Sequence, residues 1–187
     1  MTMSPFDLSG FSEAERRILE ERARRLAQPP ETPTTGETVD LVVVVLGAER
    51  YGMDVRNVQE VFPCDEVTPL PGVPPFWVGL VNLRGHLYPL LDLARYLGLP
   101  SRPPDRTNER TRSAGQVVLV AAHGLEIGLL VDDVPEVRQV LRSDIGPSLA
   151  EAAGAARSFT LGVTSDLLAV LNLAALLADS RLVVQEA

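Results

Sequence analysis

The side chains that could do chemistry are few and lie far apart along the sequence. The chain has one cysteine, Cys64, and two histidines, His86 and His123, and all 17 of its basic residues are arginines. Without a lysine, a lysine Schiff base or a Walker-type phosphate lysine is excluded. The cysteine and the two histidines could supply three zinc ligands, but their separations match no zinc-site spacing. Three unrelated residues are therefore the favoured interpretation.

The carboxylate pair Asp132–Asp133 is also a poor candidate for acid–base chemistry. Adjacent residues of a strand point to opposite faces of a sheet, so two such carboxylates cannot share one substrate. We expect them instead to end the apolar strand 126–131 in a turn. The sequence contains no G-x-S-x-G, H-E-x-x-H or C-x-x-C motif. It therefore predicts a protein that is not an enzyme and that needs neither a metal ion nor a cofactor.

Arg84 is the charged residue in the most apolar setting. It lies in the sequence NLRG, which interrupts the otherwise hydrophobic stretch 78–93. An unpaired guanidinium is costly to bury, so Arg84 must be either paired or held at a rim that faces water. Glu60, in the similarly apolar sequence VQEV, could pair with it through a bidentate contact. Spacing alone favours the simpler alternative, in which Arg84 is a turn residue and both side chains are solvated.

The composition limits the kinds of partner. A chain of 187 residues, 45% of them hydrophobic, can build a core in one domain or in two small interlocked ones. A net charge of −8 and an aromatic content of 5% argue against a nucleic-acid partner. The first residues lack the pattern of a secretory signal, and the apolar run Leu41–Leu46 is too short to cross a bilayer. We expect a cytoplasmic protein that binds other proteins and does not insert directly into a membrane.

Residues 1–38 are predicted to form an amphipathic helix followed by a flexible tether. Ser12 and Glu15 have capping-box spacing, and the helix is expected to continue to Ala27, before Pro29 and Pro30. This helix either packs on its own domain or docks to a partner, and the sequence does not decide between the two. Deletion of residues 1–36 separates them, because internal packing would lower the thermal stability, whereas docking would weaken partner binding alone.

From residue 39 onward, short strands alternate with turns. The predicted strands cover 41–46, 50–54, 77–83, 87–91, 116–122, 126–131, 134–141, 159–163 and 167–171. The segment 55–62 mixes helical spacing with β-branched residues, and the sequence does not decide its structure. Two short helices are expected, one capped by Asp92 and one beginning at Asn172. This pattern indicates an all-β barrel or sandwich, because a doubly wound parallel sheet would need helical crossovers.

An ordered series of motifs resembles the CheW family of chemotaxis coupling proteins. It begins with L-x-x-E-x-Y-G-M-D-V-x-x-V-Q-E-V, V-T-x-L-P and P-x-F-x-x-G-L-V-N-L-R-G-x-x-x-P-L-L-D-L. It continues with E-I-G-L-L-V-D-D-V-x-E-V and L-A-V-L-N-L-A-A-L-L, so that the resemblance covers residues 39–177. The sequence N-L-R-G alone would be a weak signal, whereas the complete ordered set is specific.

The resemblance implies a fold, a function and a set of site residues. The fold is all-β with few short helices, as two interlocked five-stranded β-barrels over residues 39–180, with the helical extension before them and a tail at 181–187. The function is that of a non-catalytic adaptor between the cytoplasmic tips of chemoreceptors and the regulatory domain of a CheA-type histidine kinase. The implied receptor-binding residues are Val58, Glu60, Gly79 and Arg84. The structural motif around the arginine comprises Asn82, Leu83 and Gly85. We expect a glycine at position 79 to let a receptor helix approach the backbone closely.

Departures from the family pattern leave the partners open. Ala94 stands where the family often has arginine, His86 stands where an apolar residue is common, and the helical extension is not part of the minimal adaptor. An alternative chemosensory array, controlling gliding, pili or development, is therefore compatible with the sequence. Two other functions stay open: a small-molecule-binding barrel with Arg84, His86 and Glu60 in its pocket, and an adaptor that binds the kinase without receptors.

Overall fold

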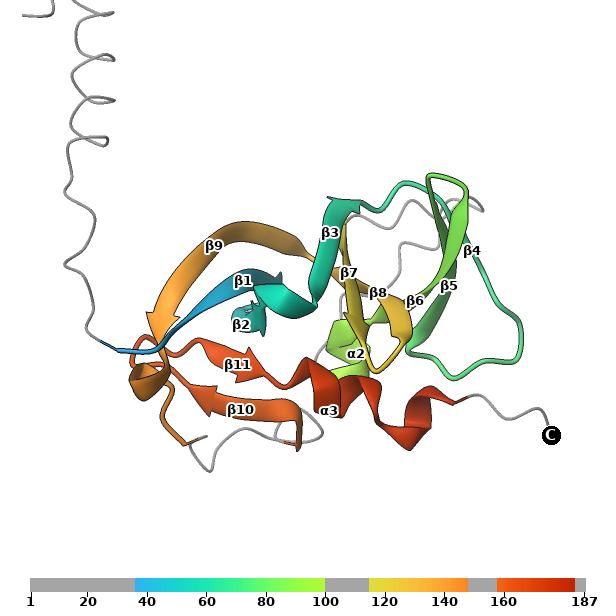
Figure 1. Ribbon diagram of the computed structural model, residues 1–187. Coiled ribbons are helices and arrows are strands. Elements are labelled where there is room, and N and C mark those ends of the chain that lie inside the picture. Colours follow the sequence, from blue (N-terminus) through green and yellow to red (C-terminus); the bar gives the residue numbers. More distant parts are fainter. Residues whose placement is uncertain (1–35, 100–114, 148–157, 184–187) are drawn as a thin grey trace, which may run out of the picture. The chain divides into compact units, whose positions relative to one another are not determined.

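The computed structural model describes residues 36–99, 115–147 and 158–183. The helix and tether predicted for residues 1–38 lie outside these ranges except for residues 36–38, of which Thr38 already belongs to the first strand, and almost all of the polar loop at 101–115 and the connector at 150–156 lie outside them too. Within the described ranges, eleven strands form two sheets, and the α-helices are two segments of five residues each (Figure 1). The predicted all-β fold with few short helices is confirmed.

The first sheet has five strands, drawn from the two ends of the described chain. They are β1 (Thr38–Leu46), β2 (Glu49–Asp54), β9 (Asp133–Leu141), β10 (Thr160–Val163) and β11 (Ala169–Leu171). Their order across the sheet is β10-β11-β2-β1-β9. A backbone bridge between Gly146 and Val163 joins the segment that follows β9 to β10, so the two edge strands of this sheet are connected.

The second sheet is built from the middle of the chain and has six strands. They are β3 (Val58–Pro63), β4 (Val67–Thr68), β5 (Trp77–Leu83), β6 (His86–Asp92), β7 (Gln116–Ala122) and β8 (Leu125–Val131). Their order is β3-β7-β8-β6-β5-β4. The family resemblance implied five strands, and the sixth is the two-residue β4, which pairs with Leu80 and Val81 of β5.

Strand β1 contributes to two hydrophobic cores at once. Leu41 and Val43 are buried in the core of the first sheet, whereas Val42, Val44 and Leu46 are buried in a core shared between the two sheets. Successive side chains of a strand point to opposite faces, so a strand that is buried on both faces must be apolar throughout. This explains the uninterrupted run LVVVVL, which a strand with one solvated face would not need.

The shared core also takes in strands of the second sheet and both helices. Its buried members come from β1, β2, β6, β7, β8 and β11, from α2 (Leu93–Leu97) and α3 (Leu173–Leu177), and include Phe159 and Leu182. The side chains of Asp92 and Asn172 each accept a hydrogen bond from the backbone N–H three residues later, at 3.0 Å. Both predicted helix starts are therefore confirmed, and the caps place the leucines of each helix in the shared core.

The 3-10 helices show where β3 begins and where the packed part of the chain ends. The undecided segment 55–62 is a 3-10 helix, η1 (Val55–Asn57), followed directly by β3. Two other 3-10 helices are η2 (Arg142–Asp144) and η4 (Ser180–Leu182). In η4, Leu182 is buried and the Arg181 guanidinium lies 4.4 Å from the centre of the Tyr96 ring. The packed part of the chain therefore continues through Leu182, into the segment assigned to the tail.

A carboxylate fixes the turn between β10 and β11 to strand β9. Both oxygens of Asp166 accept hydrogen bonds of 2.8 Å from the Arg138 guanidinium, and the Thr164 hydroxyl donates to the same carboxylate at 2.6 Å. A bidentate contact of this kind is both stronger and more directional than a single charged hydrogen bond. The Arg138 contact is the main reason that the pKa of Asp166 lies well below its usual range.

The lowered pKa of Asp166 predicts an acid-dependent contribution to stability. The contribution is complete above the ordinary aspartate pKa of about 3.9 and is lost as the pH falls through the lower pKa of the folded protein. Urea denaturation should therefore show an advantage of the wild type over Asp166→Asn that is constant above about pH 5 and shrinks below about pH 4. Arg138→Gln should lose the same advantage. A difference that stays constant from pH 7 into the acid range would contradict this assignment.

Candidate functional site

The turn predicted around Arg84 is a two-residue β-hairpin loop between β5 and β6. Leu83 and His86 are the last paired residues of the two strands, so His86, expected in the turn, belongs to β6 instead. The loop residues Arg84 and Gly85 have φ angles of +52° and +89°. Positive φ at both central residues is typical of a type I′ turn. Glycine adopts this conformation readily, whereas arginine seldom does.

Arg84 forms an ion pair with Glu60, whose side chain comes from strand β3. The distance between Arg84 Nη2 and Glu60 Oε1 is 2.7 Å. The interpretation that both side chains are merely solvated is therefore wrong. The contact joins one guanidinium nitrogen to one carboxylate oxygen, so it is not the bidentate contact considered for this pair. The Arg84 side chain remains 77% exposed and that of Glu60 30% exposed, which places the pair at a rim rather than in the core.

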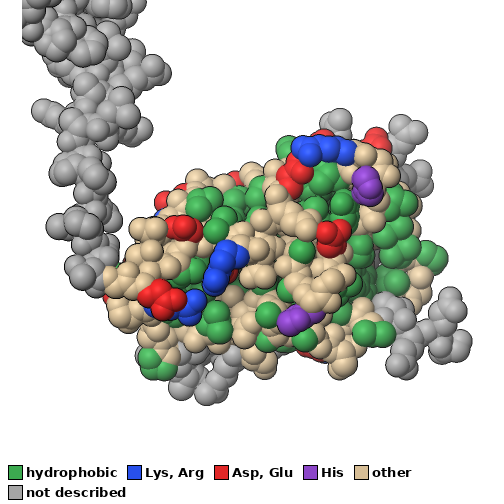
Figure 2. Space-filling model, in the orientation of Figure 1, with side chains coloured by type: hydrophobic (Ala, Val, Ile, Leu, Met, Phe, Trp, Pro, Cys, Tyr) green, Lys and Arg blue, Asp and Glu red, His purple; other side chains and the backbone are tan. Residues whose placement is uncertain are grey.

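The ion pair joins parts of the second sheet that are not hydrogen-bonded neighbours. Strand β3 is one edge of this sheet, and β7 and β8 separate it from the β5–β6 hairpin. Figure 2 shows basic and acidic side chains in contact at the top of the visible face, beside exposed hydrophobic surface. An ion pair with this exposure contributes only about 0–1 kcal/mol to stability. Its contribution to holding the sheet together is therefore small.

Apolar side chains accompany the ion pair on the same elements. Val58, the first residue of β3, is half-buried and packs against the shared core. Exposed apolar side chains lie on η1, β3 and β6, at Val55, Val61 and Leu87. Protein interfaces commonly combine an apolar centre with charged groups at the rim. The elements that carry the ion pair thus have the composition of a protein-binding surface.

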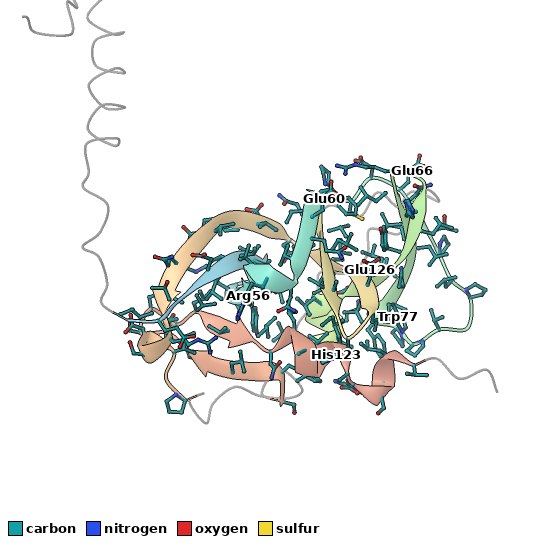
Figure 3. The ribbon with its side chains drawn as sticks, viewed as in Figure 1. Arg56, Glu60, Glu66, Trp77, His123 and Glu126 are labelled. Atoms are coloured by element: carbon teal, nitrogen blue, oxygen red, sulfur yellow. The ribbon has the colours of Figure 1, made fainter. Side chains whose placement is uncertain are left out.

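Two further polar contacts on this face were not found by sequence reasoning. Gln59 on β3 donates a hydrogen bond of 2.8 Å to Glu126 on β8, across the intervening strand β7. Asp54 accepts a hydrogen bond of 2.6 Å from Arg56, and this contact is the main reason that its pKa is lowered. Figure 3 labels Arg56, Glu60 and Glu126, which come from three different elements. The contact between Gln59 and Glu126 gives no local sequence signal because 67 positions separate the two residues.

Gly79 is buried, and it must be a glycine because of a contact within the protein itself. It has a φ of +152°, and a Cβ atom built on it would overlap the carbonyl oxygen of Thr68 in β4. The glycine therefore allows β4 to pair closely with β5. Close approach by a receptor helix, the reason expected from the sequence, is not needed to explain this residue.

The other candidate residues do not converge. Cys64 is buried in the core of the second sheet, and His123 lies in the turn between β7 and β8 with a φ of +53°. Asp132 lies in the bend that ends β8, as expected, and accepts a hydrogen bond from Gly47 N–H, whereas Asp133 is already the first residue of β9 rather than part of a turn and accepts from Gln116. Among the residues that the structure describes, no three His, Cys, Asp or Glu side chains are grouped to hold a metal ion. Nor does this part of the chain contain a helix with the length and apolarity needed to span a bilayer.

Replacement of Gly79 by alanine should test the internal cause of this glycine. The added methyl group meets a backbone carbonyl that cannot move aside, so we expect a loss of about 2–4 kcal/mol in the free energy of unfolding. Gly72 is the matched control, because it also has a positive φ but has no atom within 4 Å of a built Cβ. Gly72→Ala should cost only about 1 kcal/mol. Equal losses in urea denaturation would show that the contact with Thr68 is unimportant.

Comparisons with known proteins agree with this architecture. Residues 40–181 match the family described as CheW-like domain. The chain is 30% identical to the chemotaxis protein CheW of Rhizobium meliloti over 125 residues, covering 66% of this chain and 76% of that protein. It is 31% identical to the CheW of Klebsiella aerogenes over 131 residues, covering 68% and 74%.

A solved structure and a relative with a different name extend the comparison. The scaffolding protein TtCheW from Thermoanaerobacter tengcongensis superposes with a TM-score of 0.65 at 27% identity, covering 78% of this chain and 96% of that one. Protein FrzA of Myxococcus xanthus is 35% identical over 103 residues, covering 54% and 59%. The match to the family covers well over half of the sequence. This chain therefore belongs to the CheW-like family of chemotaxis coupling scaffolds.

Proposed function

We propose that this scaffold works in the cytoplasm, without catalysis, and joins the cytoplasmic tips of chemoreceptors to the regulatory domain of a CheA-type histidine kinase. Membership of the CheW-like family supports the proposal. The observation that carries the receptor half is the exposed ion pair between Arg84 and Glu60 at the rim of the second sheet. A pair so exposed adds little to stability, so its geometry is better explained by recognition of a partner.

The receptor-binding site that we propose comprises Val58, Glu60, Gly79 and Arg84. A guanidinium has five N–H donors in a fixed plane, and Glu60 engages one of its nitrogens. The exposed remainder can donate to carboxylate or carbonyl oxygens of a receptor helix. Val58 offers apolar contact beside the charges, and Gly79 acts indirectly, by fixing β4 against the hairpin strand β5.

The kinase-binding surface that we propose lies on the first sheet. Its outer elements carry three exposed apolar side chains: Val137 on β9, Leu161 on β10, and Leu167 in the β10–β11 turn. Leu167 is 72% exposed and has a φ of +66°, and the preceding residue, Asp166, is fixed to β9 by Arg138. A rigid turn that presents a leucine to water suits packing against the β-barrel of a regulatory domain. Separate surfaces would let one scaffold bind both partners at once.

Arg84→Glu should weaken receptor binding strongly while leaving the fold intact. The substitution places two carboxylates side by side and removes the donors proposed to contact the receptor, so we expect affinity for a receptor-tip fragment to fall by about 30-fold or more. Arg142→Glu is the matched control, because Arg142 is also an exposed arginine paired with a carboxylate, Glu37, and lies in η2, which follows β9 of the first sheet. It should bind like the wild type in isothermal titration calorimetry. Wild-type affinity of the Arg84→Glu protein would refute the receptor site.

Leu167→Asp should affect binding to the kinase rather than to the receptor, the opposite of Arg84→Glu. A charge at the centre of an apolar contact is costly to desolvate, so binding to the kinase regulatory domain should weaken by about 10-fold or more while receptor binding is unchanged. Leu87→Asp, an exposed leucine on the second sheet, should leave kinase binding intact. The measurement is a pull-down of each partner separately. If Leu167→Asp retains the kinase and loses the receptor, the two surfaces have been assigned the wrong way round.

A further inference from the structure

We infer that Asn82 is a positioning residue, which restricts the backbone of Arg84 within the left-handed conformation of the turn and so aims the guanidinium at Glu60 and at a partner. The inference rests on the proposed role of Arg84 in receptor binding. Its structural basis is one hydrogen bond, in which the Gly85 N–H donates to Asn82 Oδ1 at 2.9 Å. The acceptor lies three residues before the donor, so the contact spans the loop residue Arg84.

A second hairpin of the same chain forms the same kind of turn without such a side-chain contact. Strands β7 and β8 also end in a two-residue loop, between the paired residues Ala122 and Leu125. Its residues His123 and Gly124 have φ angles of +53° and +78°, close to those of Arg84 and Gly85. Both loops thus have the backbone signature of a type I′ turn, with a non-glycine residue first and glycine second.

The two hairpins differ at the position three residues before the loop glycine. In β5 this residue is Asn82, whereas in β7 it is Ala121, whose methyl group cannot accept a hydrogen bond. The backbone carbonyl of Ala121 accepts instead from the Asn57 side chain, at 3.3 Å. Because the second hairpin adopts the same turn with alanine there, the side-chain contact of Asn82 is not required to form a hairpin of this type.

The contact has a more limited role, which is to restrict the backbone motion of the loop residues Arg84 and Gly85. The paired strands already bring the first loop residue into the left-handed region, as His123 shows, but this conformation is unfavourable for a residue with a side chain, and an exposed ion pair adds little to its stability. The Asn82 acceptor satisfies the amide of Gly85 only when the loop is closed, so it favours this conformation over the alternatives. A restricted Arg84 loses less conformational entropy when a partner binds, which increases affinity without adding a contact to the interface.

The test compares Asn82→Ala with Asn82→Asp, which retains an acceptor oxygen at the same position. In the uniformly labelled full chain, backbone ¹⁵N order parameters of Arg84 and Gly85 should fall from about 0.85 to below about 0.6 in Asn82→Ala and recover in Asn82→Asp. Those of His123 and Gly124 serve as the internal control and should not change. Affinity for a helical-hairpin fragment of a chemoreceptor tip encoded in the same genome should fall by about 3- to 10-fold in Asn82→Ala and recover in Asn82→Asp.

The outcomes separate this inference from the proposed function, with Arg84→Ala measured alongside. Loss of order and of affinity in Asn82→Ala, both recovered in Asn82→Asp, supports the inference. Unchanged order parameters at Arg84 and Gly85 in Asn82→Ala overturn the inference. It is also overturned if Asn82→Ala has lower order parameters but binds the fragment like the wild type, while Arg84→Ala binds it weakly. If Arg84→Ala itself binds the fragment like the wild type, the proposed receptor site fails and the inference fails with it.

Discussion

Burial of strand β1 on both of its faces is the constraint on which the rest of the structure depends. One set of its side chains fills the core of the first sheet, and the alternate set fills the core that the two sheets share. Neither sheet can therefore be completed without the other. Because the second sheet is inserted in the chain between β2 and β9, closing the first sheet also fixes where the second lies.

In this arrangement the core stabilises the fold, and the rim carries the residues that we propose for recognition. The buried valines and leucines of the shared core supply the main stabilisation, at about 25 cal/mol for each Å² of apolar surface removed from water. The charged groups at the rim are then available for recognition, because the fold does not depend on them. Arg84 and Glu60 illustrate this, since they form a well-defined contact that adds little stability. The same reasoning applies to Leu167, an exposed leucine on a turn fixed by neighbouring charges.

Features with a local cause could be predicted from the sequence, whereas features that depend on distant residues could not. The run at 41–46 predicted a strand through the β-branched composition of the segment itself, and Asp92 and Asn172 predicted helix starts because each caps a backbone N–H three residues later. The sequence does not favour the pairing of Arg84 with Glu60, since 24 positions separate them and no spacing rule connects two strands of unknown order. The cause of Gly79 was missed for a related reason, because Thr68 becomes its neighbour only when β4 pairs with β5.

The proposed division of the surface gives the rim around Arg84 and Glu60 to the receptor and the first sheet to the kinase. Its most direct test is one NMR titration, in which the ¹⁵N-labelled chain is mixed with the unlabelled receptor-tip fragment and each backbone amide shift is followed. We expect the largest shifts on β3 and on the tip of the β5–β6 hairpin, with β9 and the β10–β11 turn unaffected. Shifts centred on Val137, Leu161 and Leu167 instead would contradict it.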